Sequence, residues 1–460
     1  MSDQAQAAQS GAPGFKKEIG LFSGINVLVG IIIGSGIFYL GIFVLGEVKL
    51  SMGFALLAWA IGGLISLLGG LCFAELGAMN PKAGGMYNYL SDAYHPALGF
   101  SNEWTSIFIS GAGSNAALAL VFANAISRLV EIDDMSIKLI AIASILVLSC
   151  INFFGVKFGA LVQNVFTMAK VIPIVLILVW GIFAGKESPN INLTIPAGVD
   201  GFGGVVTMIA LGVIMSMWAY DGWTNLNAVA EEIKNPQKNL PRAIIIALSS
   251  ITLLYVLFNF AIFRILPISE IMSHEGPSLS IKAGETIMGS PGLTLVAITI
   301  LISVFGSLNG CIMSFPRSYY AVARDGHFIP AYSLLHKKYA TPWVAIVIQC
   351  VISIILVMLR NLGQLTALVV FASILYKMIT VFSVIIFRKK QPNTPRPYKV
   401  PFTYVTVIIA TLSMLGILIS VLINMTETSI IGLAIPLSGI LVYFLFFNKN
   451  KSIIKLSKEK

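Results

Sequence analysis

The chain has 460 residues, of which 57 % are apolar and only 11 % are charged, and its formal net charge is +10. Soluble domains are about 45–50 % apolar and about 25 % charged, so this composition excludes an ordinary soluble domain and indicates a chain whose solvent is lipid. The four cysteines all fall in apolar segments and the four histidines are scattered, so we expect neither a disulfide framework nor a metal site.

The N-terminus is polar, and the rest of the chain is a series of apolar runs. The opening stretch MSDQAQAAQSGAPG lacks the apolar run and cleavage site of a signal peptide, so we expect residues 1–17 to form a disordered cytoplasmic tail. The apolar runs that follow are long enough to cross a bilayer. We predict twelve membrane-spanning helices, near residues 20–46, 52–78, 97–127, 137–154, 160–184, 205–230, 242–266, 291–322, 343–359, 364–387, 401–424 and 429–447.

The basic residues indicate which side of the membrane the loops occupy. An even number of spans places both termini on one side. If that side is the inside, most of the 30 lysines and arginines lie in the inner loops and in the C-terminal tail, as the positive-inside rule requires. The charge therefore reflects topology and not nucleic-acid binding. We expect a multi-pass protein of the cell inner (plasma) membrane, with cytoplasmic termini and a basic cytoplasmic tail over 449–460.

Two of the predicted spans are interrupted. The first contains 34-GSG-36 and the sixth contains 218-WAYDG-222, and each opens a block of five spans. Paired interruptions in two halves are the best sequence sign of a transporter's binding site. We therefore predict an all-α polytopic membrane protein with a 5+5 inverted repeat, discontinuous helices 1 and 6, and helices 11 and 12 outside the repeat. The two repeats and the last helix pair are expected over 18–186, 200–390 and 400–448.

The interruptions create backbone groups that need partners. An unwound helix in lipid leaves N–H and C=O groups whose lack of a partner costs several kcal/mol each. The carboxylate of an amino acid would suit the positive start of the half-helix near Ser35 and Gly36, and its ammonium would suit carbonyls near Ile32 and Trp218. A GSG alone would be better explained as close helix packing. The second interruption favours the binding site.

Two charged residues inside the predicted spans are functional candidates, because charge is costly in a membrane. Asp221 lies in the second interruption, where it would order the unwound loop or cap the next half-helix by accepting N–H bonds. Its backbone carbonyl would remain available to a substrate ammonium. Lys170 lies about 15 Å from the inner end of the fifth span, too far to snorkel easily. We expect carbonyls of the broken first helix, and hydroxyls such as Ser303 and Ser307, to hold its ammonium in place of a coupling metal ion.

Other polar features of the spans have a structural as well as a functional explanation. Glu103 and Lys377 would be either structural residues facing the lumen or part of the site. Glu75 and Arg317 lie near the inner ends of their spans, where gate or loop ion pairs explain them as well as a chemical role does. The stretch 111-GAGSNA-116 fits a dinucleotide-binding pattern but lacks the strand before it and the acidic residue after it. We interpret it as helix packing, with Ser114 and Asn115 facing the substrate.

Several stretches together resemble a known family. They are 34-GSGIF-38, 75-ELGAMNPKAGGMYNYL-90, 218-WAYDGWTNLNAVAEEIKNPQKNLPRAI-244 and 317-RSYYAVARDGHFIP-330. The set resembles the amino acid–polyamine–organocation (APC) superfamily, and the third stretch is most similar to the L-type amino acid transporters (LAT family). Within this group the chain looks closest to bacterial exchangers of alanine, serine and cysteine. The resemblance implies the LeuT/APC fold and sodium-independent, one-for-one exchange of small neutral L-amino acids by alternating access.

The resemblance also implies roles for individual residues. Ser35 and Gly36 match positions that bind the substrate carboxylate, and Ile32, Trp218 and Asp221 match positions whose backbone carbonyls take the ammonium. Trp218 also matches the aromatic gate above the substrate. The remaining positions expected in the pocket are Gly34, Ser114, Asn115, Tyr220 and Thr224.

Three features bear on coupling, partners and substrate size. Lys170 matches the lysine that stands where sodium-coupled relatives bind an ion. Animal members have a cysteine after the third span that links to a heavy chain, but 128-RLVEIDDMSIK-138 has none, so no disulfide-linked heavy chain is expected. Trp218 stands where relatives often have Phe, which would narrow the pocket and favour small side chains.

Other functions agree less well with the sequence than exchange does. A proton- or sodium-coupled amino acid symporter is the nearest alternative: Lys170 argues against sodium, although a titrating lysine could couple to protons. A channel would need a repeated filter or a ring of charge, and a membrane enzyme would need a catalytic motif; the sequence has neither. We expect amino acid substrates and the lipid bilayer as partners, without a cofactor or nucleic acid.

Overall fold

The computed structural model describes residues 15–127, 130, 132–273, 278–360, 362–424 and 426–448. Most of the N-terminal tail expected over 1–17, and the whole basic tail expected over 449–460, therefore lie outside the described residues. So do three positions of the loop in which no cysteine was found, 128, 129 and 131.

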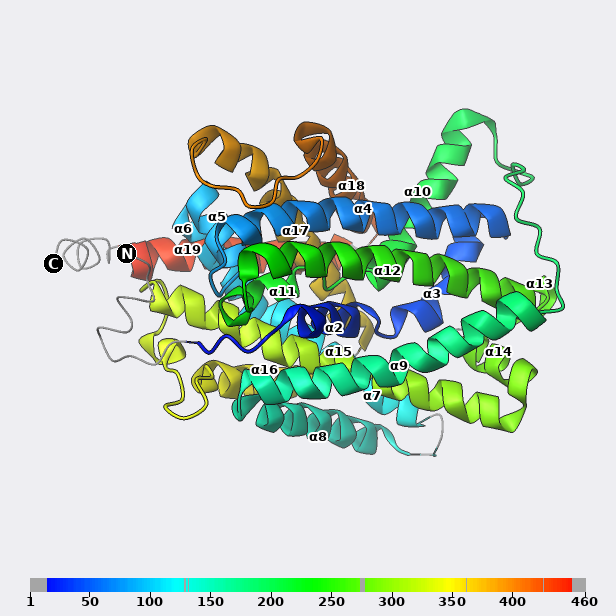
Figure 1. The fold of residues 1–460 in the computed structure, drawn as a ribbon, viewed down its shortest axis with the longest axis horizontal. Helices are drawn as coiled ribbons and strands as arrows, with labels where there is room; N and C mark the ends of the chain where they lie inside the picture. Colours follow the sequence, from blue (N-terminus) through cyan, green and yellow to red (C-terminus); the bar gives the residue numbers. More distant parts are fainter. Residues whose placement is uncertain are drawn as a thin grey trace.

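The described part of the chain is folded almost entirely into helices (Figure 1). Within it, the isolated backbone bridge between Ile19 and Ile233 is the one pairing of strand type. The elements are α2 (Leu21–Ile32), α3 (Gly36–Glu47), α4 (Met52–Met79), α5 (Met86–Ala93), α6 (Pro96–Thr105), η1 (Ser106–Ser110), α7 (Gly111–Ser127), α8 (Asp134–Phe153), α9 (Val156–Ala184), α10 (Gly201–Ala219), α11 (Asn225–Ala228), η2 (Ala230–Glu232), α12 (Pro236–Ile265), α13 (Ile268–Ser273), α14 (Ser278–Met288), α15 (Ser290–Arg324), η3 (Pro330–Ser333), α16 (Trp343–Leu359), α17 (Leu362–Lys390), α18 (Thr403–Asn424), α19 (Thr426–Val442) and η4 (Tyr443–Phe447).

The lengths of these helices support a polytopic membrane protein. Within the described residues, ten helices are long and apolar enough to cross a membrane, and the bent pair α2–α3 makes an eleventh candidate span. Helix α16 is apolar but has 17 residues, at the short end of the range of about 17–25 residues that span a bilayer. Counting α16 gives the twelve spans predicted, and that number stays a prediction.

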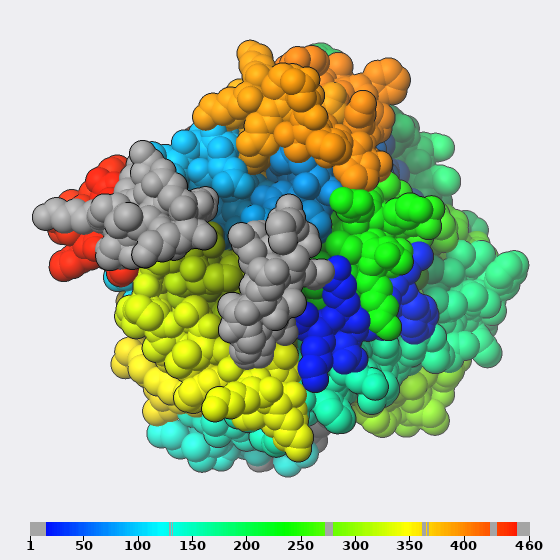
Figure 2. All heavy atoms as spheres, turned by 60° about the vertical axis from the view of Figure 1, so that its left-hand side comes forward, coloured from blue at the N-terminus to red at the C-terminus, as the bar shows by residue number. Residues whose placement is uncertain are grey.

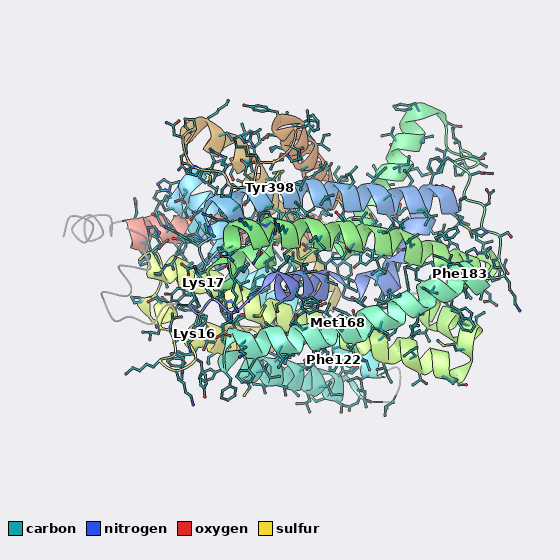
Figure 3. The ribbon with its side chains drawn as sticks, in the orientation of Figure 1. Lys16, Lys17, Phe122, Met168, Phe183 and Tyr398 are labelled. Carbon is teal, nitrogen blue, oxygen red and sulfur yellow. The ribbon has the colours of Figure 1, made fainter. Side chains whose placement is uncertain are left out.

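Several of the long helices, among them α4, α9 and α12, run side by side along the longest axis of the molecule (Figure 1). Figure 3 places Lys16 and Lys17 at the left-hand end of the bundle and Phe183, near the end of α9, at the right-hand end. Helix α2 packs against α9, α12 and α15. The broken first span is therefore enclosed by other helices, where irregular backbone can exist at membrane depth.

Helix α9 shows how the sequence creates an inward polar face. Gln163, Thr167 and Lys170 recur every three or four residues, so they share one face of the helix, and all three are buried. Phe158 and Leu161 are exposed apolar residues of the same helix. This reverses the pattern of a soluble helix, because lipid covers the outside and polar partners lie inside.

A backbone pairing joins the stretch before α2 to the stretch after α11. The N–H of Lys234 donates to the carbonyl of Ile19 at 2.8 Å, and the N–H of Ile19 donates to the carbonyl of Glu232 at 2.9 Å. Figure 2 shows the first described residues, in dark blue, against green atoms of the chain near this pairing. The flanks of the two interrupted spans are thus tied together, which the sequence did not reveal.

Candidate functional site

Both interrupted spans break where the sequence predicted. Helix α2 ends at Ile32 and α3 begins at Gly36, and the two are bent by 49°. Helix α10 ends at Ala219, and the chain turns before α11 begins at Asn225. The two predicted interruptions are therefore confirmed.

Two glycines allow the two breaks to touch. A Cβ atom on Gly36 would lie 2.8 Å from both Cα and Cβ of Ala219, the last residue of α10. Gly222 has a φ of +113°, which side chains rarely adopt, and a Cβ there would lie 2.5 Å from Cγ2 of Ile31. Both positions therefore require glycine, because Ala219 lies too close to Gly36, and Ile31 too close to Gly222, for a side chain to fit. At Gly222 the positive φ requires glycine as well.

A cavity of about 170 Å³ borders on both breaks. Protein cavities of about 150 Å³ can hold a molecule of the size of benzene, so this space suits a small organic molecule. The predicted site residues that line it are Ile32, Gly34, Ser35, Gly36, Ser114, Trp218, Asp221 and Thr224.

Two residues expected in the pocket lie behind its wall. Asn115 is fully buried, and its side-chain amide donates to the hydroxyl of Ser353 at 3.5 Å. Tyr220 is also fully buried, and its hydroxyl donates to the carbonyl of Trp59 at 2.9 Å. Neither side chain lines the cavity, because α7 and the end of α10 turn these faces toward neighbouring helices.

The start of α3 offers an anion site to the cavity. The first N–H groups of a helix have no partner within it, and the side chain of Ser35 does not cap them. Ser35 and Gly36 both line the cavity. The positive end of the helix dipole therefore borders this space, an arrangement that suits a carboxylate.

Tyr255, which the sequence analysis missed, links the carbonyl groups at the ends of α2 and α10. The hydroxyl of Tyr255, on α12, lies 3.2 Å from the carbonyl oxygens of both Ile32 and Ala219. The side chain is fully buried. A tyrosine inside an apolar span needs a partner for its hydroxyl, and that was the signal available in the sequence.

Lys170 lies directly behind the first break. Its ammonium donates to the carbonyl oxygens of Gly30 at 2.6 Å, of Ser303 at 3.2 Å and, at close range, of Ile33. The lysine is fully buried, and Figure 3 places Met168, two positions earlier, about halfway along the bundle. The prediction that oxygens of the broken helix hold this ammonium is confirmed.

The two predicted serines act differently from the expectation. The hydroxyl of Ser303 donates to the carbonyls of Ile33 at 2.8 Å and of Gly34 at 3.0 Å, and that of Ser307 donates to the carbonyl of Gly30 at 3.0 Å. They thus share carbonyl acceptors with Lys170. The hydrogen bonds of the ammonium go to backbone carbonyls, so the expected ligation by these hydroxyls is not seen.

Asp221 is part of an ion pair and does not cap α11. Its carboxylate accepts the N–H of Gly222 at 2.6 Å and forms a close ion pair with Lys377, which reaches across from α17. Thr224 is the residue at the N-cap of α11, and it makes no side-chain cap. The expected cap is therefore wrong, because the carboxylate faces α17 and the cavity instead of the start of the half-helix.

The other charged residues noted in the sequence also find partners. The side chains of Arg317 and Glu232 are buried and lie 2.7 Å apart, and Glu75 accepts from Arg388 at 2.7 Å and from the N–H of Val400 at 2.6 Å. These contacts confirm the predicted ion pairs.

Glu103 borders the cavity from α6. One of its carboxylate oxygens accepts from Asn102 at 2.7 Å, and the other is a buried atom without a hydrogen bond in the structure. Among the described residues, no cluster of three or more His, Cys, Asp or Glu is suited to a metal ion.

Comparison with known proteins covers almost the whole chain. The sequence pattern of the family described as amino acid permease matches residues 19–447. The chain is 35 % identical over 436 residues to the serine/threonine exchanger SteT of Bacillus subtilis, which covers 94 % of this chain and 97 % of that protein. It is 32 % identical over 445 residues to human b(0,+)-type amino acid transporter 1, with 96 % and 90 % covered. It is 33 % identical over 451 residues to human large neutral amino acids transporter small subunit 2, with 96 % and 83 % covered.

Proposed function

The chain belongs to the amino acid permease family, and within the APC superfamily to the L-type amino acid transporters; from this premise we propose that it exchanges small neutral L-amino acids one for one, without sodium, by alternating access. It is a multi-pass membrane protein that transports amino acids, and it is not an enzyme. The proposal includes twelve spans arranged as a 5+5 inverted repeat, with both termini on the cytoplasmic side of the inner (plasma) membrane.

The observation that carries the proposal is the cavity between the two broken helices. We assign the substrate carboxylate to the start of α3 at Ser35 and Gly36, and the ammonium to the backbone carbonyls of Ile32, Trp218 and Asp221. This pairing of an anion site with carbonyl acceptors suits a zwitterion. Because the cavity measures about 170 Å³, it favours small side chains.

The aromatic gate is assigned to Trp218. This side chain lines the cavity and is 36 % exposed, so it is not locked into the core as Tyr220 is. Movement of such a ring over a bound substrate would separate the cavity from one side of the membrane. That role fits the alternating access proposed for the family fold.

Sodium independence is supported by the surroundings of Lys170. Three backbone carbonyls converge on its ammonium, and oxygens of this kind would otherwise suit a small cation. The fixed charge of the lysine occupies that position. We therefore assign Lys170, with Ser303 and Ser307, as the substitute for an ion site.

We propose that the carrier works without a disulfide-linked heavy chain. Its four cysteines all lie in helices and are unpaired: Cys72, Cys150, Cys311 and Cys350. The loop that would carry the linking cysteine has none in the sequence. The protein expressed without any partner should therefore take up labelled alanine into preloaded liposomes.

Uptake into liposomes tests the proposed exchange. Purified protein in liposomes preloaded with unlabelled alanine should take up labelled alanine, and empty liposomes should take up far less. Serine and threonine should compete, in line with the activity named for the Bacillus subtilis relative. Equal uptake into empty liposomes would contradict exchange. Accumulation driven by a sodium or proton gradient would instead support a coupled symporter.

Replacing Lys170 should slow transport more than it weakens binding. In Lys170→Ala we expect the turnover rate to fall about tenfold to a hundredfold, because hydrogen bonds to a charged group are worth about 1.5–3 kcal/mol and about 1.4 kcal/mol corresponds to a factor of ten. The lysine holds the first break without lining the cavity, so the KM should change much less. The measurement is initial exchange rate against external alanine concentration.

A matched control comes from the same helix. Lys157 lies on α9 and is exposed, so Lys157→Ala should exchange alanine at nearly the parental rate. If Lys170→Ala behaves like this control, the assigned role of Lys170 is wrong.

A further inference from the structure

The ion pair between Lys377 and Asp221 forms part of the wall of the substrate cavity. Lys377 is on α17 and Asp221 is in the break after α10, and both line the cavity. The lysine side chain is 9 % exposed and the aspartate side chain is 37 % exposed. The ammonium also lies over the ring of Trp223, 5.9 Å from its centroid. The lysine is thus held by two groups, while the carboxylate remains partly open to the cavity.

The pair also lies beside a second, apolar cavity. This space of about 640 Å³ is bordered by α3, α10, α17 and α18, and it shares Ser35, Trp218, Asp221 and Lys377 with the substrate cavity. The two charges therefore lie at the boundary of the two cavities. A substrate side chain directed away from the half-helix start at Ser35, past Trp218, would meet this pair.

The alkyl stem and ammonium of Lys377 resemble the side chain of a cationic amino acid. The ammonium of Lys377, on α17, is already bound to the Asp221 carboxylate. This carboxylate is the group to which a cationic side chain of a substrate would bind. While this contact exists, a second ammonium or guanidinium near Asp221 would meet a fixed positive charge. An uncharged side chain does not suffer this repulsion.

We propose that Lys377 determines the substrate class of this carrier: its ammonium occupies the Asp221 carboxylate and so excludes amino acids with cationic side chains. The proposal deepens the proposed function, because it concerns which amino acids the same cavity accepts. Removing the lysine leaves the carboxylate for a substrate, and removing the aspartate leaves the ammonium for one. The two single substitutions should therefore change selectivity in opposite directions.

The first experiment measures competition in the full-length carrier. Liposomes preloaded with alanine take up labelled alanine while unlabelled lysine or arginine is added outside. The parent should not be inhibited. In Lys377→Met, lysine should inhibit, with its apparent affinity relative to alanine raised about tenfold or more, as expected when a charged partner becomes available. Asp221→Asn combined with Lys377→Met should remove this inhibition.

The reverse substitution tests the same pair independently. Asp221→Asn alone leaves Lys377 unpaired, so glutamate and aspartate should begin to inhibit alanine uptake. This variant keeps the backbone carbonyl assigned to the substrate ammonium. If Lys377→Met fails to fold, the gain of acidic competitors in Asp221→Asn still decides the proposal.

A matched control and a second readout separate the possible failures. Lys282→Met removes a lysine from an ion pair with Glu285 on α14, away from both cavities, and should leave selectivity unchanged. Thermal stabilisation of the detergent-purified variants by lysine or glutamate reports binding without exchange. Thermal stabilisation can therefore support the selectivity proposal even if the liposome experiment contradicts one-for-one exchange.

A folded Asp221→Asn that glutamate and aspartate fail to inhibit would overturn the proposal, and so would three results with lysine as the competitor. Lysine could inhibit the parent as strongly as Lys377→Met, or fail to inhibit or stabilise a folded Lys377→Met. Lysine could also still inhibit the double variant, which would place its partner elsewhere, with Glu103 as the other carboxylate lining the cavity.

Discussion

Gly36→Ala should reduce alanine exchange at least about a hundredfold, because a shift of about 1 Å at a binding site can cost that much. The added methyl group would lie 2.8 Å from Cα and Cβ of Ala219, and neither atom belongs to a flexible side chain that can move aside. The start of α3 must therefore separate from the end of α10. That displacement moves the assigned carboxylate site away from the carbonyl acceptors of the second break. Labelled alanine uptake into preloaded liposomes is the measurement.

The same helix provides the control for this substitution. Apart from its chain neighbours and the backbone of its own helix, a Cβ atom on Gly46 would have no atom within 4 Å, so Gly46→Ala should exchange alanine normally. Both variants should elute as folded protein in detergent, since the change at Gly36 acts on the site and not on the whole bundle. Exchange by Gly36→Ala within about twofold of the Gly46→Ala rate would show that the close approach is not needed.

Arg317→Met should lower the free energy of unfolding by about 3–5 kcal/mol, because it leaves the buried carboxylate of Glu232 without its partner. The two side chains are 0 % and 2 % exposed, and they join α15 to the segment after α11 at 2.7 Å. Equilibrium unfolding of the purified protein in mixed detergent measures the loss. Glu232→Gln should produce a smaller loss, since the arginine can still donate to an amide oxygen.

Two further variants distinguish the stability effect of breaking the buried ion pair from the effect of removing any charged residue. Arg324→Met removes a partly exposed arginine paired with Glu231 and should cost about 1 kcal/mol or less. Replacing both buried partners, Arg317→Met with Glu232→Met, should recover most of the lost stability, because no unpaired charge then remains. If Arg317→Met costs no more than Arg324→Met, the buried pair is not a determinant of stability.

The sequence predicted the long helices well because apolar runs of bilayer length have few alternative structures. The predicted span 343–359 coincides with α16, and the predicted span 52–78 differs from α4 by one residue. The surroundings of Lys170 were predictable for a related reason: an ammonium at mid-membrane must find oxygens. Short elements such as α5 and α14 have no comparable signal and were missed.

Contacts between distant segments could not be predicted in the same way. Lys377 was recognised as a charge inside a span, but its partner Asp221 lies in the break after α10 and is identified only by proximity. The expected cap at Asp221 failed for this reason, since a local rule was applied to a residue whose partner is remote. The roles of Ser303 and Ser307 were inverted because a hydroxyl can donate as well as accept, and sequence does not indicate the direction.

The hydroxyl of Tyr255 has a single hydrogen, although it lies 3.2 Å from two carbonyl oxygens at the ends of α2 and α10. One proton cannot make two full hydrogen bonds at once, so the two carbonyls share a single hydroxyl donor. If the end of either helix moves away, the hydroxyl is left to donate fully to the other, so the two breaks compete for one proton.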